Sequence, residues 1–143
     1  MSLYLCDTTC LVAAVSSWHE HHERTLAELD RRTKRGDELV LASHSLAETY
    51  SVLTRLPAPY RLRAEDALAA IEANWRSAPV VHLTGTETWD ALSEAVRLGA
   101  VGGRTYDTLI ARAALKARAE SILTWNVGDF AAFAPRTRVD APP

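Results

Sequence analysis

Short apolar runs alternate with longer amphipathic segments along almost the whole chain, and this alternation restricts the fold more than any other feature. The apolar runs cover residues 3–6, 39–42, 79–83 and 121–124, and we expect residues 137–139 to form a short last strand. Each run is short enough for a buried strand, and the segments between them carry apolar residues at helical spacing. Strands that alternate with helices predict an α/β fold with a mostly parallel central sheet of four to five strands and helices on both faces.

Composition is consistent with one globular domain over residues 1–143. Hydrophobic residues make up 48% of the chain and charged residues 24%, which is enough apolar material for a core. The sequence has no internal repeat and no linker long enough to separate two domains. The net charge of −2 excludes a general basic field, so an anionic partner would need a local basic patch or a metal ion.

Cysteine usage and hydropathy exclude several other classes. Cys6 and Cys10 have no second pair, so they make neither a disulfide framework nor a zinc site, and we expect two small buried side chains. The sequence has no recognisable signal peptide, and no apolar run reaches the roughly 18 residues that a membrane helix needs. We therefore expect no membrane association and a cytoplasmic location.

Residues 104–114 open a helix with a carboxylate in its first turn. A glycine pair ends the preceding element, and Thr105 can cap the helix. Apolar residues then recur at helical spacing from Tyr106 to Ala117, which predicts one buried face. Asp107 lies at the edge of that face, where the helix dipole favours a negative charge. Dipole compensation alone would explain this residue unless other carboxylates lie nearby.

Three further carboxylates occupy positions that a parallel sheet can bring together. Asp7 and Asp129 each follow a predicted buried strand, and Glu48 lies on the helix after another. The carboxyl ends of parallel strands meet at one edge of a sheet, which is where ligands bind in such folds. Simpler interpretations remain open, since Asp7 could cap the next helix and the periodicity around Glu48 is that of a surface residue.

Carboxylates that converge in one cleft need a compensating cation. Without one they would raise each other's pKa. Arg104, three residues before Asp107, is the basic residue placed to help on the same helix. Oxygen donors without a thiol cluster predict Mg²⁺ or Mn²⁺ rather than zinc.

Polar or amphipathic helices are also predicted in segments that carry none of these four carboxylates. The segment from His19 to Arg35 opens with several histidines, whose spacing favours solvated helix surface over a metal site. The segment from Thr86 to Leu98 places Trp89, Leu92 and Val96 on one stripe, which predicts a buried face.

Taken together, these motifs resemble the signature of PIN-domain ribonucleases, and most closely the VapC-type toxins of toxin–antitoxin pairs. The resemblance covers nearly the whole chain and implies a PIN-like three-layer sandwich. It is carried, in order, by Asp7-Thr8-Thr9, by Glu48 within residues 46–53, by Asp107 within 106–111, and by Asp129 within 124–130.

The resemblance also implies the roles of individual residues. Asp7, Glu48, Asp107 and Asp129 would form the catalytic, metal-binding set. Hydroxyl support would come from Thr8 or Thr9 and from Thr124, with Asn126 as a polar neighbour where some relatives carry an acid. Arg104 would contact a substrate phosphate, although a surface salt bridge explains it nearly as well.

The implied activity is that of a Mg²⁺- or Mn²⁺-dependent endoribonuclease that cleaves structured RNA such as tRNA or rRNA. Metal-activated water would attack and leave 5′-phosphate and 3′-hydroxyl ends. The resemblance further implies a homodimer silenced by a small cognate antitoxin. One alternative is a non-catalytic module that binds RNA or a partner, motivated by Asn126. Another is a phosphatase with Asp7 as nucleophile, which the absence of an Asp-x-Asp pattern disfavours because Thr9 stands at the second position.

Overall fold

A five-stranded parallel sheet forms the centre of the protein in a computed structural model, which describes residues 2–133 and 136–143. The strand order is β3-β2-β1-β4-β5, and every neighbouring pair is parallel. The predicted fold class is confirmed, although β3 is only two residues long. The strands are β1 (Leu3–Cys6), β2 (Glu38–Ala42), β3 (Val80–Val81), β4 (Ser121–Leu123) and β5 (Arg138–Asp140).

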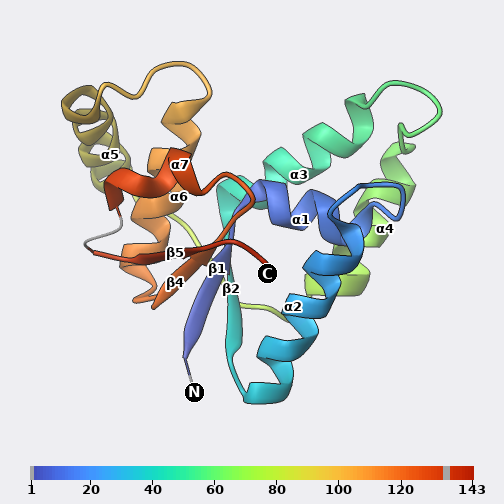
Figure 1. Cartoon of the computed structure of the whole chain (residues 1–143). Helices are drawn as coiled ribbons and strands as arrows, with labels where there is room; N and C mark the ends of the chain where they lie inside the picture. The colour runs from blue at the N-terminus through green and yellow to red at the C-terminus, as the bar shows by residue number, and fades with distance from the viewer. Residues whose placement is uncertain (1, 134–135) are drawn as a thin grey trace.

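Helices cover both faces of this sheet, as the alternating pattern predicts. In Figure 1, α5, α6 and α7 lie to one side of the strands, and α1 to α4 lie to the other. The helices are α1 (Thr8–Val15), α2 (His22–Arg35), α3 (Ser43–Arg55), α4 (Ala64–Trp75), α5 (Gly85–Leu98), α6 (Arg104–Lys116) and α7 (Val127–Phe130), followed by a 3₁₀ turn (Ala131–Phe133). No helix in the described ranges is long and apolar enough to cross a membrane.

Alternate residues of the central strand β1 belong to two separate hydrophobic cores. Tyr4 and Cys6 of β1 pack with residues of α1, α3 and α4, whereas Leu5, between them in sequence, packs with α6 and α7. This is the two-faced burial expected of a central parallel strand. Cys6 and Cys10 are both buried and free, as predicted.

The inner face of α2 is charged, which the sequence pattern did not indicate. The helix begins at His22 rather than His19, and its buried residues are Thr25, Glu28 and Arg32. Arg32 donates to Glu28 at 2.7 Å, to Ser121 at 3.1 Å and to Asp140 at 3.1 Å. Because every buried charge has a close partner, α2 can pack on the sheet through an ionic network instead of an apolar stripe.

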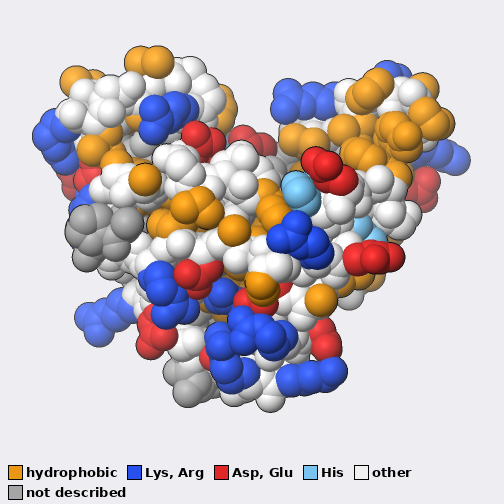
Figure 2. Space-filling model, viewed as in Figure 1, with side chains coloured by type: hydrophobic (Ala, Val, Ile, Leu, Met, Phe, Trp, Pro, Cys, Tyr) orange, Lys and Arg blue, Asp and Glu red, His pale blue; other side chains and the backbone are white. Residues whose placement is uncertain are grey.

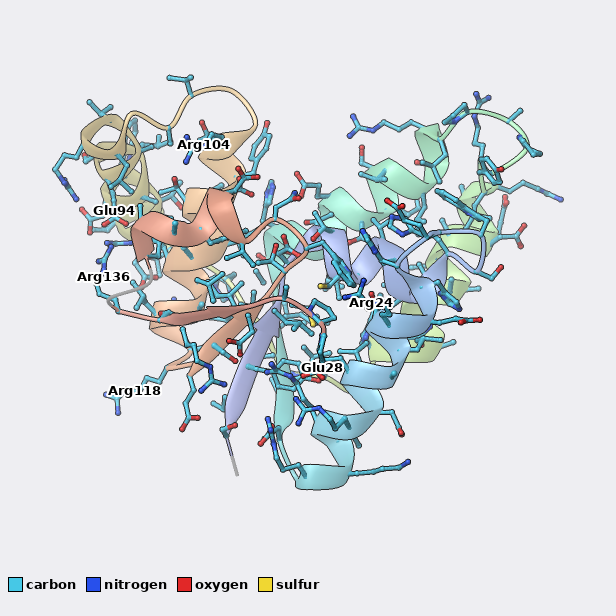
Figure 3. The ribbon with its side chains drawn as sticks, in the orientation of Figure 1. Arg24, Glu28, Glu94, Arg104, Arg118 and Arg136 are labelled. Atoms are coloured by element: carbon cyan, nitrogen blue, oxygen red, sulfur yellow. The ribbon has the colours of Figure 1, made fainter. Side chains whose placement is uncertain are left out.

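The predicted apolar face of α5 is wrong. Trp89 is 73% exposed, and the buried residues are Ala91, Glu94 and Ala95 on another side of the helix. The small alanines allow α5 to approach α6 closely. Glu94 accepts hydrogen bonds from Arg97 of the same helix, from Arg112 of α6 and from Arg136 near the C-terminus. These three guanidinium groups compensate the buried charge of Glu94, so this side of α5 can face the rest of the protein. Figure 3 shows Glu94 and Arg136 close to each other.

The start of α6 also differs from the prediction. The helix begins at Arg104 after Gly103, and no side chain caps it, so Thr105 is not the cap. Tyr106 is 45% exposed and does not join the buried face. Its ring stacks instead on His44 of α3, with ring centroids 4.7 Å apart. This aromatic contact joins α3 to α6 next to the residues described below.

Candidate active site

Asp7 lies where the central strand β1 ends and α1 begins. Its backbone N–H donates to the carbonyl of Leu123 at 3.1 Å, which fixes it against the end of β4. Its side chain caps α1 by accepting a hydrogen bond from the backbone N–H of Cys10 at 3.1 Å. Asp7 therefore both caps α1 and lies at the edge of the sheet.

Two threonine hydroxyls fix the Asp7 carboxylate from opposite sides. Thr9 Oγ1 donates to Oδ1 at 2.7 Å, and Thr124 Oγ1 donates to Oδ2 at 2.6 Å. The side chain is only 2% exposed, and this burial raises its pKa to about 6 despite the three hydrogen bonds. Oδ1 thus accepts two hydrogen bonds and Oδ2 one, so Oδ2 retains capacity for a further ligand.

Asp107 carries the clearest electrostatic sign of a shared site. Burial raises its pKa to about 7, and repulsion from Asp129, Asp7 and Glu48 adds to this effect. Arg104 acts in the opposite direction without cancelling it. Because repulsion of this kind requires nearby charge, the fold brings four carboxylates from four separate elements into one region.

Glu48 and Asp129 complete this group of carboxylates. Glu48 projects from α3, and its Oε2 lies 3.6 Å from Nε2 of His44, which is too long for a hydrogen bond. Asp129 lies in the first turn of the short helix α7. Neither carboxylate is fully buried, so both can move to meet a bound cation.

The donor set fits a hydrated hard cation better than a closed metal cage. Within residues 2–133 and 136–143, no three Asp, Glu, His or Cys side chains meet closely enough to hold a metal ion directly. Carboxylate oxygens are nevertheless the ligands that Mg²⁺ and Mn²⁺ prefer, and Mg²⁺ commonly keeps several waters. The free acceptor capacity of Asp7 and the excess negative charge around Asp107 suit such a cation.

A groove of about 420 Å³ opens beside Glu48, and Asp7, Asp107 and Asp129 are not part of its lining. One part of its lining consists of Thr8, Thr9, Glu48 and Asn126. Another part consists of the ring side chains His19, His21 and Trp125. The groove is therefore lined by polar, acidic and aromatic side chains together, and it can contact both charged and aromatic parts of a ligand.

The supporting residues are distributed somewhat differently from the prediction. Thr8 lines the groove, but its buried hydroxyl has no hydrogen-bond partner among the described residues, whereas the hydroxyl of Thr9 reaches Asp7. Asn126 donates its backbone N–H to Thr124 Oγ1 at 2.9 Å, and its exposed side chain borders the groove. Arg104 is exposed at the start of α6.

Sequence reasoning missed the ring side chains around the groove. His21 stacks on Trp125 with centroids 3.8 Å apart, although about a hundred residues separate them. His44, which neighbours Glu48, was not singled out either. No local pattern marks such long-range pairs. The only available signal was the position of Trp125 directly after Thr124, at the end of a buried strand.

Comparison with known proteins decides the family. The PIN domain family profile matches residues 4–134. The chain belongs to the PIN domain family. Ribonuclease VapC40 of Mycobacterium tuberculosis is 36% identical over 118 residues, which is 82% of each chain. Ribonuclease VapC27 of the same species is 36% identical over 115 residues, which is 80% of this chain and 78% of the relative. The resemblance to VapC-type proteins is therefore confirmed.

Solved structures support the same fold at lower sequence identity. VapBC2 from Rickettsia felis, bound to a promoter DNA fragment, superposes with a TM-score of 0.71 at 18% identity, over 97% of this chain and 98% of that one. VapC20 from Mycobacterium tuberculosis, described as a sarcin-ricin loop cleaving toxin, gives 0.71 at 20% identity, over 90% and 94%. This PIN-domain chain thus has the three-layer arrangement of VapC proteins.

Proposed function

We propose that this PIN-domain protein is a Mg²⁺- or Mn²⁺-dependent endoribonuclease and the toxin of a toxin–antitoxin pair. The observation that carries the proposal is the convergence of Asp7, Glu48, Asp107 and Asp129 at one edge of the sheet, with the pKa of Asp107 raised by burial and, in addition, by the other three carboxylates. Relatives named as VapC ribonucleases, at 36% identity, support RNA as the substrate.

In this proposal each carboxylate has a definable task. Asp7 is the most rigid, because three hydrogen bonds orient it, and it would be the fixed ligand. Asp107 and Asp129 would complete the cation site, and Glu48 would bind a second cation or orient the attacking water. A bound divalent ion supplies charge neutralisation at the phosphodiester and lowers the pKa of a water molecule. Arg104 would contact a neighbouring phosphate.

The experiment is RNA cleavage by the purified protein with Mg²⁺, Mn²⁺ or EDTA. Asp7→Asn and Asp129→Asn should abolish cleavage, and Asp90→Asn, an exposed carboxylate on α5 purified in the same way, should retain it. The products should carry 5′-phosphate and 3′-hydroxyl ends. Cleavage that survives EDTA and both site variants, or that gives a 2′,3′-cyclic phosphate, would contradict the proposal.

The partners follow from the same proposal. We expect a structured RNA of the tRNA or rRNA class as substrate, a small cognate antitoxin as inhibitor, a homodimer as the working unit and the cytoplasm as the location. Residues 1–143 would act as one domain. Light scattering of the purified protein, alone and with the product of the adjacent gene, tests the assembly separately from cleavage.

One second candidate has a structural observation in its favour. The carboxylates of the described residues do not form a ready-made metal cage, so a non-catalytic module that binds RNA or a partner is the alternative. It predicts RNA binding that survives Asp7→Asn, with no cleavage under any metal. An aspartyl-phosphate mechanism gains no support, because Thr9 stands where that chemistry needs a second Asp, and its hydroxyl donates to Asp7 instead.

A further inference from the structure

A continuous series of aromatic rings runs from the carboxylate site to the surface. Trp125 stacks on His21 at 3.8 Å, and His21 lies 5.5 Å from His19. His19 lies 5.5 Å from Trp18, and Trp18 stacks on Tyr60 at 4.4 Å. The rings come from three separate segments of the chain, so only the tertiary fold produces this series.

The inner end of the series is rigid and tied to the site. Trp125 stacks on His21, and the guanidinium of Arg24 lies over the indole, 5.0 Å from the ring centroid. Its indole N–H donates to Thr25 at 2.9 Å, and its backbone N–H donates to Thr9 at 3.1 Å. Thr9 is also the residue that donates to Asp7. These contacts hold Trp125 in place as a fixed wall of the groove.

The outer end of the series has the opposite character. Trp18 is 44% exposed and Tyr60 is 43% exposed, although the two rings are stacked on each other. They border a pocket of about 190 Å³ whose other walls include Val15, Leu53 and Leu62. Exposed, preordered rings beside a hollow lose little conformational entropy when a flat ligand stacks on them.

Basic side chains surround the loop that carries Tyr60. Arg55, Arg61 and Arg63 are all exposed within a few residues of it. Arg61 Nε donates to the carbonyl of Leu56 at 2.8 Å, so at least one guanidinium has a defined position. In Figure 2, the arm formed by α3 and α4 shows hydrophobic surface flanked by Lys and Arg side chains. Aromatic rings beside basic groups are the usual composition of a single-strand binding surface.

We propose that the pocket at Trp18 and Tyr60 holds an unpaired base of the RNA substrate, next to the segment cleaved at the carboxylates. The inference rests on the proposed ribonuclease function and adds a contact for one base of its substrate. Bases splayed from a loop stack on aromatic side chains, whereas paired bases cannot reach such a pocket. Exposed arginines on the same loop contact the flanking phosphates.

The test measures RNA binding separately from cleavage. Binding of two labelled hairpins is measured by fluorescence anisotropy in an Asp129→Asn background, which prevents turnover. The hairpins share one stem; one loop carries its bases, and the other is made of abasic nucleotides. Tyr60→Ala removes the ring, Tyr60→Phe keeps it, and Trp89→Ala is the matched control, an exposed aromatic on α5. Thermal melting of each variant confirms folding.

Tyr60→Ala should weaken binding of the base-bearing hairpin about 5- to 100-fold, and binding of the abasic hairpin less than about twofold. Tyr60→Phe and Trp89→Ala should bind as the background protein does. Equal losses on both hairpins, or no loss on either, overturn the inference. Unchanged RNA binding with loss of binding to the adjacent gene's product would instead assign the pocket to a protein partner, which also overturns it.

Cleavage by the wild-type protein distinguishes failure of the base pocket from failure of the proposed ribonuclease function. If wild-type protein cleaves the base-bearing hairpin but Tyr60→Ala binds both hairpins normally, only the base pocket is rejected. If wild-type protein neither cleaves nor binds either RNA, the ribonuclease function and the pocket are rejected together.

Discussion

Replacing Asp107 by Asn should make the metal-free protein more stable while abolishing cleavage. Burial and three neighbouring carboxylates raise the pKa of Asp107 from its usual 3.8 to about 7. By linkage, a difference of this size corresponds to about 4 kcal/mol of lost folding free energy at pH 8. Asp107 is partly exposed, and Asn loses the favourable helix-dipole interaction, so the expected gain is smaller, about 1–2 kcal/mol.

The dependence on pH identifies the cause. A carboxyl group whose pKa is raised in the folded state is favoured by protonation, so folding stability falls as pH rises from about 4 towards about 7. The wild-type protein should therefore approach the stability of Asp107→Asn near pH 4 and fall below it by pH 8. Urea unfolding in EDTA, followed by circular dichroism between pH 4 and pH 8, measures the difference in unfolding free energy between the two proteins. This difference is called the gap below.

A metal ion and a remote carboxylate provide the controls. Saturating Mn²⁺ should reduce the gap at pH 8, because the cation stabilises the wild-type carboxylates and binds the variant less well. Asp90→Asn on α5, which is exposed, should not change stability with this pH profile. A gap that does not vary with pH, or a variant less stable than wild type at pH 8 in EDTA, would refute the electrostatic argument.

Three further substitutions test the contacts around the site and the helices. Thr124→Val removes the 2.6 Å hydrogen bond to Asp7 and should reduce cleavage by about 10- to 100-fold, with Thr124→Ser restoring it in the same initial-rate assay. Glu94→Gln leaves three arginines without their carboxylate and should lower the unfolding free energy by about 3 kcal/mol in urea titrations, whereas Glu65→Gln on the surface of α4 should change little. Arg32→Met leaves Glu28 buried and paired only with Arg31, and should cost a similar amount at pH 7. That loss should diminish in acid, because Arg31 and Arg32 together hold the pKa of Glu28 below its usual value.

The sheet could be predicted from sequence because its physical determinants are local. A short apolar run such as Leu3–Cys6 can hardly be anything other than a buried strand when amphipathic segments flank it. Once strands and helices alternate, the sheet must be largely parallel, and residues that follow strands, such as Asp7, gather at one edge. The convergence of the carboxylates was therefore foreseeable from their order alone.

The inner faces of the helices were less predictable because burial there does not follow hydrophobicity. α2 buries Glu28, which pairs with Arg31 and Arg32 of the same helix. α5 buries Glu94, which pairs with Arg112 and Arg136 from distant parts of the sequence. A hydrophobic stripe identifies the inner face only when apolar contacts dominate the packing. On α5, alanines and a compensated charge dominate, and Trp89 is left in solvent.

The aromatic series shows a third situation, in which each residue is ordinary by itself. His19 and His21 look like solvated helix surface, and Tyr60 looks like a turn residue next to prolines. Their significance arises only because the loop between α1 and α2 contacts both the loop between α3 and α4, through Trp18 and Tyr60, and Trp125, through His21. A function that depends on loops brought together by the fold leaves no periodic signal in the sequence. The carboxylates would therefore determine where the RNA is cut, and the loops would determine which RNA is held there.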